Sequence, residues 1–220
     1  MMEIVQIGLL GGLLGLDATA VGQFMASRPL VAGVLAGWLL GNPTLGIAIG
    51  AILELYFLVS FPTGGARFPE GSTATVVAVA AAAPFGGAGA VPLAIALGLI
   101  WGQLGGASVS LQRHLNSRIV PESGDRSPGA RRLVVAHLGA IFVDFWRGAL
   151  VTIVGVWLGR AAMGLLAEGW PLLAAPSVGL LLVGGAVSGG ILLRDLGGFR
   201  RTRIWFAAGL ALGVIGTRFL

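Results

Sequence analysis

The chain lacks several residue types that common enzyme classes need. It contains no cysteine, and its fourteen basic residues are all arginines. Without cysteine there are no disulfides, no thiolate catalysis and no cysteine-ligated metal. Its histidines, His114 and His137, are too few and too far apart for a zinc site, so we expect neither a metal nor a cofactor.

Charge is also scarce, and apolar residues take its place. Charged residues make up 10% of the chain, against roughly 25% in soluble proteins. Hydrophobic residues make up 56%, and the mean hydropathy is +0.92. At about 20 residues per span, this composition predicts an all-α integral membrane protein with six to eight membrane segments, some re-entrant or broken. We expect residues 1–220 to form a single membrane-embedded domain.

The arginines are concentrated in two inter-helix segments. Arg113 to Arg132 contains five and Arg194 to Arg203 contains four, whereas Gly159 to Trp170 between them contains one. This alternation predicts that the two richer segments face the cytoplasm. The net charge of +5 does not indicate a nucleic-acid partner, because no aromatic residues interleave with the arginines.

The first half of the chain contains short, broken apolar runs. Ile4 to Leu16 is expected to form a first membrane helix rather than a signal peptide, because Glu3 stands where a basic leader would be. Leu30 to Gly41 is too short to cross a membrane and predicts a re-entrant half-helix. Leu45 to Phe61 is interrupted by Glu54 and ends at Pro62. Two adjacent broken elements indicate a transporter binding site.

The second half has longer elements. Gly71 to Gln112 is broken near its middle by glycines and prolines and predicts two elements joined by a tight turn. Leu133 to Leu158 and Pro171 to Leu193 are long enough to span, and Ile204 to Thr217 predicts a short last helix. Glycines recur at four-residue spacing, as in Gly33, Gly37 and Gly41, Gly46 and Gly50, and Gly185 and Gly189, which favours close helix packing in lipid.

Charged residues interrupt the apolar sequence in the region from Asp17 to Ser72. Such residues in a membrane usually face a polar pathway or a partner, because burying them costs at least ~3 kcal/mol. We therefore interpret this region as a substrate site, with candidate ligands Asp17, Gln23, Glu54, Arg67, Glu70 and Ser72.

The same region carries a recognisable motif. Gln23 precedes Ser27-Arg28-Pro29, VAGVLAGWLLGNPTLGIAIGAILEL ends at Glu54, and GGARFPEGS follows. This string resembles the IIC membrane component of the mannose/fructose/sorbose family of the bacterial phosphoenolpyruvate-dependent sugar phosphotransferase system.

The resemblance implies a multi-pass sugar permease subunit of the bacterial inner membrane. It implies a hetero-oligomer with a IID membrane subunit and soluble IIA and IIB proteins, in which a phosphohistidine on IIB donates the phosphoryl group. The chain itself would then not be an enzyme. An elevator motion of a mobile core is a family-level analogy.

The acidic candidates have alternatives. Glu54 could bind sugar hydroxyls, form an ion pair with Arg28 or Arg67, or titrate. Glu70 could equally cap or charge the start of the following helix.

The remaining polar residues also have alternatives. Gln23 could form a helix–helix hydrogen bond, Asp17 could mark a helix break, and Arg28 could be an interfacial anchor. Asp144 and Arg147 share a helix face with His137, which favours a structural or subunit-interface role.

Functions of other classes remain open at this point. One is a small transporter or importer subunit unrelated to the phosphotransferase system. A second is a membrane enzyme using Glu54 and Glu70 as acid and base, and a third is a structural assembly protein. The sequence leaves the sugar unspecified.

Overall fold

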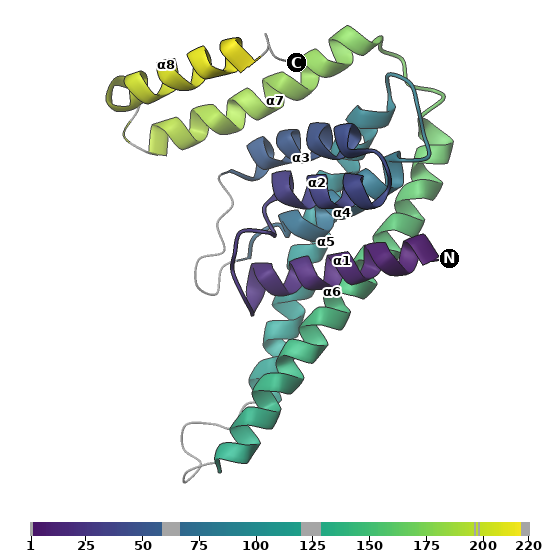
Figure 1. Cartoon of the computed structure of the whole chain (residues 1–220), viewed down its shortest axis with the longest axis vertical. Helices are drawn as coiled ribbons and strands as arrows, with labels where there is room; N and C mark the ends of the chain where they lie inside the picture. Colours follow the sequence, from purple (N-terminus) through teal and green to yellow (C-terminus); the bar gives the residue numbers. More distant parts are fainter. Residues whose placement is uncertain (1, 59–66, 120–128, 196, 198, 217–220) are drawn as a thin grey trace.

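The computed structural model describes residues 2–58, 67–119, 129–195, 197 and 199–216, and the regular elements in these ranges are all helices (Figure 1). In chain order they are α1 (Met2–Thr19), α2 (Pro29–Leu39), α3 (Pro43–Phe57), α4 (Gly71–Ala82), α5 (Ala90–Ile119), α6 (Ala130–Leu166), α7 (Ala174–Asp195) and α8 (Phe199–Gly216). The prediction of an all-α membrane protein is confirmed.

Helix lengths divide the chain into spans and half-spans. Among the described residues, α1, α5, α6 and α7 are long and apolar enough to cross a membrane, whereas α2, α3 and α4 are apolar but shorter. The half-helix predicted at Leu30 to Gly41 is α2, which has Pro29 in its first turn. Asn42 starts α3 because its side chain accepts a hydrogen bond from Leu45 N at 3.1 Å.

Helix α4 lies at the centre of the core. It packs against α1, α2, α3, α5 and α6, and eleven of its twelve residues are buried. Its small and β-branched residues have no polar face, as expected of a helix surrounded by protein. Glu70 precedes its first turn, and Arg160 Nε donates to Ala80 O at 3.0 Å near its last. An acid at the N-terminus and a base at the C-terminus complement the helix dipole.

Helices α2 and α3 pack through glycines. A Cβ atom on Gly37 would lie 2.7 Å from Asn42 O and 2.8 Å from Gly46 Cα, and one on Gly50 would lie 2.7 Å from Pro29 O. The predicted close packing is therefore confirmed for this pair of helices. It does not extend to Gly41 or Gly189, where a Cβ would meet nothing within 4 Å.

Three segments expected to be loops are partly helical. Helix α5 runs to Ile119 and α6 starts at Ala130, so much of the Arg113 to Arg132 segment is helix, and residues 120–128 lie outside the described part. The expected loop from Gly159 is helical to Leu166, because Arg160 is neutralised by Glu3 and anchored on α4. Helix α8 begins at Phe199, before the predicted Ile204, and Thr217 is not described.

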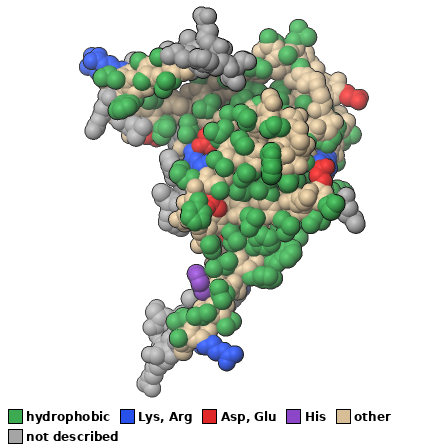
Figure 2. Space-filling view, in the orientation of Figure 1, with side chains coloured by type: hydrophobic (Ala, Val, Ile, Leu, Met, Phe, Trp, Pro, Cys, Tyr) green, Lys and Arg blue, Asp and Glu red, His purple; other side chains and the backbone are tan. Residues whose placement is uncertain are grey.

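The last part of α5, ending at Ile119, and the first part of α6, starting at Ala130, project from the core as an arm (Figure 1). Hydrophobic side chains are spread over the visible face of the core and continue onto this arm, and basic side chains lie near its far end (Figure 2). Helices α7 and α8 form a hairpin at one side of the core, in which α7 packs against α3 and α8 contacts α7 (Figure 1). The polar side chains described below therefore lie within an apolar exterior.

Candidate functional site

Asp17 organises the connection between α1 and α2. Its carboxylate is buried and accepts hydrogen bonds from Phe24 N at 2.7 Å and Ser27 N at 2.8 Å. The chain turns sharply around these donors, and Gln23 and Met25 both have positive φ angles, 52° and 64°. Non-glycine residues adopt such angles at a cost, so Asp17 compensates for local strain next to the site.

Arg28 and Glu54 form an ion pair where α2 begins. Arg28 Nε lies 2.8 Å from Glu54 Oε1, and Arg28 Nη2 contacts the same oxygen. The second carboxylate oxygen accepts from Leu30 N at 3.2 Å, at the unsatisfied N-terminus of α2. Both side chains keep partial exposure, 28% for Arg28 and 18% for Glu54, so a ligand can reach them.

Glu70 forms a second ion pair, which is buried. Arg147 of α6 holds its carboxylate in two parallel contacts, Nη2 to Oε1 at 2.7 Å and Nη1 to Oε2 at 2.9 Å. Thr73 Oγ1 also donates to Glu70 Oε2 at 2.8 Å. The Glu70 carboxylate makes no capping bond to the backbone of α4, although Glu70 occupies the N-cap position. This bidentate geometry is among the strongest hydrogen-bonded pairings available to a carboxylate.

The buried network continues to α1 and α5. Arg147 Nε contacts Asp144 Oδ1 at 2.9 Å, Thr19 Oγ1 donates to Asp144 Oδ2, and Arg147 Nη1 contacts Ser108 Oγ at 3.0 Å. The predicted Asp144–Arg147 pair is thus present, and it also joins four helices. With two acids and one base, the network has a formal charge of −1.

A cavity of about 120 Å³ lies between the two ion pairs, and we call it the loop cavity. It opens between the start of α2, the end of α3 and the start of α4. Its lining comprises Ala18, Ser27, Arg28, Pro29, Phe57, Phe68, Pro69, Glu70, Gly71 and Ser72. Ser72 is 1% exposed, and its hydroxyl has no hydrogen-bond partner within the described part of the chain. An unpartnered buried hydroxyl is uncommon, and a ligand hydroxyl would satisfy it.

The structure brings some of the predicted ligands together. Glu70 and Ser72 line the loop cavity, and Glu54 is joined to it through Arg28. Asp17 holds the neighbouring turn by backbone contacts.

Two predicted ligands lie apart from these. Gln23 and Arg67 are exposed, and neither is among the described residues that line the cavity. Residues 59–66, which include the end of the predicted apolar run and the start of the GGARFPEGS segment, lie outside the described part of the chain.

Several residues of the site are not among the predicted ligands. Ser27, Phe57 and Phe68 line the cavity, while Thr19 and Ser108 support the buried network. One indirect sequence signal for the position of Glu70 is Gly105 of α5. A Cβ on Gly105 would lie 2.8 Å from Glu70 Oε2, so a glycine is needed where the acid lies against this helix.

Comparisons with known proteins agree with the motif. A family model described as the sorbose-specific IIC component of the phosphotransferase system matches residues 1–186. The sorbose-specific EIIC component of Lacticaseibacillus casei is 30% identical over 76 residues, which is 34% of this chain and 27% of that protein. The aligned segment therefore spans about a quarter of the curated relative.

Two solved structures have a similar fold. One is described as a membrane protein, with a TM-score of 0.75 and 20% identity over 100% of this chain and 93% of that one. The other is the mannose transporter ManYZ, solved by cryo-electron microscopy with microcin E492, with a TM-score of 0.63 and 18% identity. It covers 99% of this chain and 92% of that one. At these identities the likeness concerns the fold, whereas the family model spans most of the sequence: the chain belongs to the sorbose-specific IIC component family of the phosphotransferase system.

Proposed function

We propose that the chain is the sugar-translocating subunit of a phosphotransferase-system permease in the bacterial inner membrane. It moves a hexose or an amino sugar inward, coupled to phosphorylation of that sugar by a partner IIB protein. Membership of the IIC family supports this function and removes the alternative of a transporter unrelated to the phosphotransferase system. The name of the ManYZ relative supports a hexose as the cargo.

The observation that carries the proposal is the polar composition of the loop cavity. Ser72 presents a buried hydroxyl with no partner among the described residues, in a lining that also includes Glu70 and Arg28. A sugar offers both donors and acceptors in its hydroxyls, and its C–H faces pack against apolar rings such as Phe57 and Phe68. The combination of apolar walls with a few convergent polar groups is typical of small-molecule sites.

The loop cavity must enlarge to admit a sugar. Its volume of about 120 Å³ lies below the roughly 300 Å³ at which ligand pockets begin. The walls belong to separate elements, because Arg28 precedes α2 while Glu70 and Ser72 start α4. We expect sugar binding to separate these two helix starts, with the partly exposed Arg28–Glu54 pair rearranging first.

Phosphorylation would be the task of partner proteins. We propose that IIA and IIB supply the phosphoryl group and that a IID membrane subunit completes a hetero-oligomer. This chain would move and orient the sugar, and incubation with phosphorylated IIB is expected to leave no stable phosphate on His114 or His137.

Replacing Ser72 by alanine tests the proposed site. Ser72→Ala removes a hydroxyl that bonds to no described residue, so thermal stability should be unchanged. Loss of one neutral hydrogen bond to the sugar should weaken binding about two- to tenfold. We would measure equilibrium binding of D-mannose, L-sorbose and D-glucosamine to the purified complex, and uptake in cells from which the native gene is deleted.

Thr75→Val is the matched control. Thr75 lies one turn further along α4 and is equally buried, but its hydroxyl donates to Gly71 O at 2.7 Å and does not line the loop cavity. This change should leave sugar affinity intact. Equal affinity in both variants would move the sugar away from Ser72, and no binding or uptake of any sugar by the unaltered protein would refute the function.

A further inference from the structure

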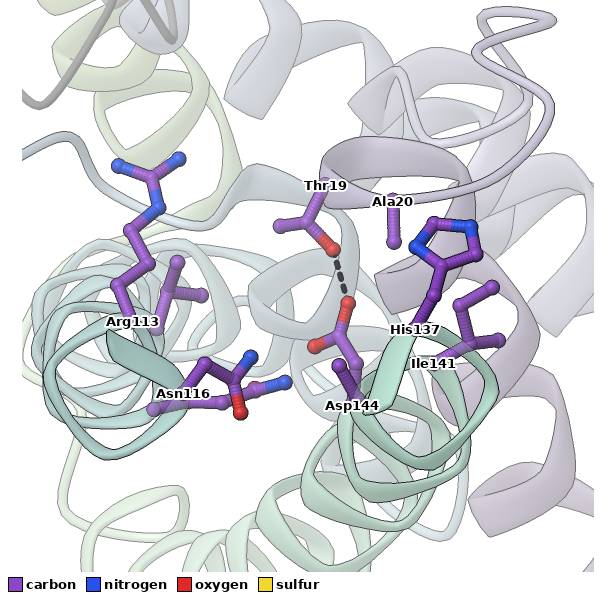
Figure 3. Close-up of a pocket in the computed structure, with 10 residues that line it drawn as sticks. Thr19, Ala20, Arg113, Asn116, His137, Ile141 and Asp144 are labelled. Atoms are coloured by element: carbon purple, nitrogen blue, oxygen red, sulfur yellow. Dashed lines mark hydrogen bonds between the residues drawn. The ribbon is translucent and has the colours of Figure 1, made fainter. Parts of the chain in front are cut away.

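A second, larger cavity lies between α1, α5 and α6, and we call it the arm cavity (Figure 3). Its volume is about 300 Å³, within the range of small-molecule sites. The polar residues that line it are Thr19, Gln112, Arg113, Asn116, His137 and Asp144. None of them lines the loop cavity, so the arm cavity is a separate site at the base of the arm.

Gln112 indicates that the arm cavity accommodates a ligand. The residue is 8% exposed, and its Oε1 is buried with no hydrogen-bond donor in the described ranges. Asn116 stands one turn further along α5, and Figure 3 shows Asn116 and Asp144 across the space between α5 and α6, with Thr19 bonded to Asp144. A buried acceptor without a donor is rare in a protein interior and is satisfied by a group from outside the chain.

The lining selects the chemistry of that group. Gln112 Oε1 and the Asp144 carboxylate accept hydrogen bonds, the Asn116 amide donates and accepts, and Val109 and Ile141 provide apolar surface. The charged side chains of the lining, Arg113 and Asp144, have opposite signs, so the lining gives no excess charge to favour an ionic ligand. An uncharged molecule with several hydroxyl groups matches both the acceptors and the apolar wall.

The two cavities share a partition. Arg113 of the arm cavity stacks over Phe68 of the loop cavity, with 5.4 Å between the guanidinium carbon and the ring centroid. Glu70 of the loop cavity and Asp144 of the arm cavity are both held by Arg147. Each contact thus joins one wall of one cavity to one wall of the other. The Arg147 contacts hold the partition together, and a sugar passes between the cavities where the Arg113–Phe68 stack separates.

We propose that the arm cavity is a second binding site for the uncharged sugar, on the side of the arginine-rich end of the arm. The inference rests on the proposed transport function. The arm cavity would be a second binding position between the loop cavity and the cytoplasm. There the sugar is held by Gln112, Asn116 and Asp144 before it meets the phosphoryl donor.

Single cysteines in this cysteine-free chain can test the two cavities separately. Ala140→Cys reports on the arm cavity and Ser27→Cys on the loop cavity, since each lines its own site. Ser117→Cys, exposed on α5 and outside both linings, is the control. The rate of labelling by N-ethylmaleimide is measured in the purified complex over a range of D-mannose, L-sorbose and D-glucosamine concentrations.

At least one of these sugars should protect both Ser27→Cys and Ala140→Cys, while Ser117→Cys reacts at an unchanged rate. Protection of Ser27→Cys alone means that the arm cavity holds only water and overturns the second site, while leaving the transport function intact. Protection of neither cysteine contradicts the transport function as well.

Gln112→Met separates direct binding from a remote conformational effect. Combined with Ala140→Cys, it should raise the half-protecting sugar concentration about two- to tenfold, the loss of one neutral hydrogen bond. Combined with Ser27→Cys, it should leave the half-protecting concentration unchanged. Thermal stability should not fall, because Gln112 Oε1 has no donor to lose among the described residues. Unchanged protection at Ala140→Cys, or a clear loss of thermal stability, would overturn the proposal.

Discussion

The two ion pairs of the core have the same chemistry but different surroundings. Arg147 and Glu70 are 9% and 0% exposed in their side chains, whereas Arg28 and Glu54 are 28% and 18% exposed. The buried pair has further partners in Asp144 and Thr73. A buried pair is costly to break and cannot exchange partners with water, whereas a half-exposed pair is worth less and is open to competition.

This difference assigns separate tasks to the two pairs. The Glu70–Arg147 pair joins α4 to α6, so it holds the central helix against the longest helix of the core. The Arg28–Glu54 pair joins the start of α2 to the end of α3, beside the loop cavity. We infer that the first pair maintains the scaffold and that the second responds to the sugar.

Arg147→Met should have the largest effect. It leaves Glu70 and Asp144 as buried acids without their base, at a cost of about 3 to 5 kcal/mol. We expect little folded protein, measured by size-exclusion chromatography and thermal unfolding in detergent. A variant that folds and melts like the parent would show that the network contributes little to stability.

Neutralising the whole network is the control for this change. Arg147→Met combined with Glu70→Gln and Asp144→Asn removes the uncompensated charge, so much of the lost stability should return. Uptake should stay low, because Glu70 lines the loop cavity. Failure of the triple variant to recover stability would mean that the specific hydrogen bonds matter more than the buried charge.

Glu54→Gln should affect sugar binding rather than folding. The pair that it weakens is half-exposed, so the stability loss should stay below about 1 kcal/mol. We expect Glu54 to contact the sugar once the Arg28–Glu54 pair rearranges, and loss of that charge-assisted contact should cost about 1.5 to 3 kcal/mol, or roughly ten- to hundredfold in affinity. Sugar binding per assembled complex is the decisive measurement. Normal affinity with less assembled complex would make Glu54 a structural residue.

The broken helices could be predicted from the sequence because their signals are local. Pro29 and Asn42-Pro43 fix the starts of α2 and α3, and twelve apolar residues cannot span a membrane. Helix ends were less predictable where no proline or glycine intervenes. Arg160 remains in α6 because it forms an ion pair with Glu3 and a hydrogen bond to Ala80 O, and both partners belong to distant segments of the chain.

The candidate site was predictable only in part, for the same reason. The Asp144–Arg147 pair follows from a three-residue spacing, but Glu70 and Arg147 are 77 residues apart and meet only when α4 packs against α6. The Gln112 acceptor and the Arg113–Phe68 stack likewise depend on tertiary packing. Sequence therefore identified which charges need an explanation, whereas their partners required the fold.

Gly105→Ala tests the tightness of the buried network with the smallest change. The added methyl would lie 2.8 Å from Glu70 Oε2 and 3.2 Å from Thr73 Oγ1, so the carboxylate must move away from Arg147 or α5 must shift. Overpacking of this kind typically costs about 1 to 2 kcal/mol, measured by thermal unfolding. Gly139→Ala on α6 is the matched control, because its methyl meets nothing within 4 Å and should stabilise the helix by up to about 1 kcal/mol. Since the half-exposed pair is untouched, Gly105→Ala should leave the Arg28–Glu54 contact in place, and any loss of sugar affinity would then be transmitted through Glu70. Equal stability of the two alanine variants would mean that the core yields around Glu70, and the contrast between a rigid buried pair and a responsive exposed pair would no longer hold.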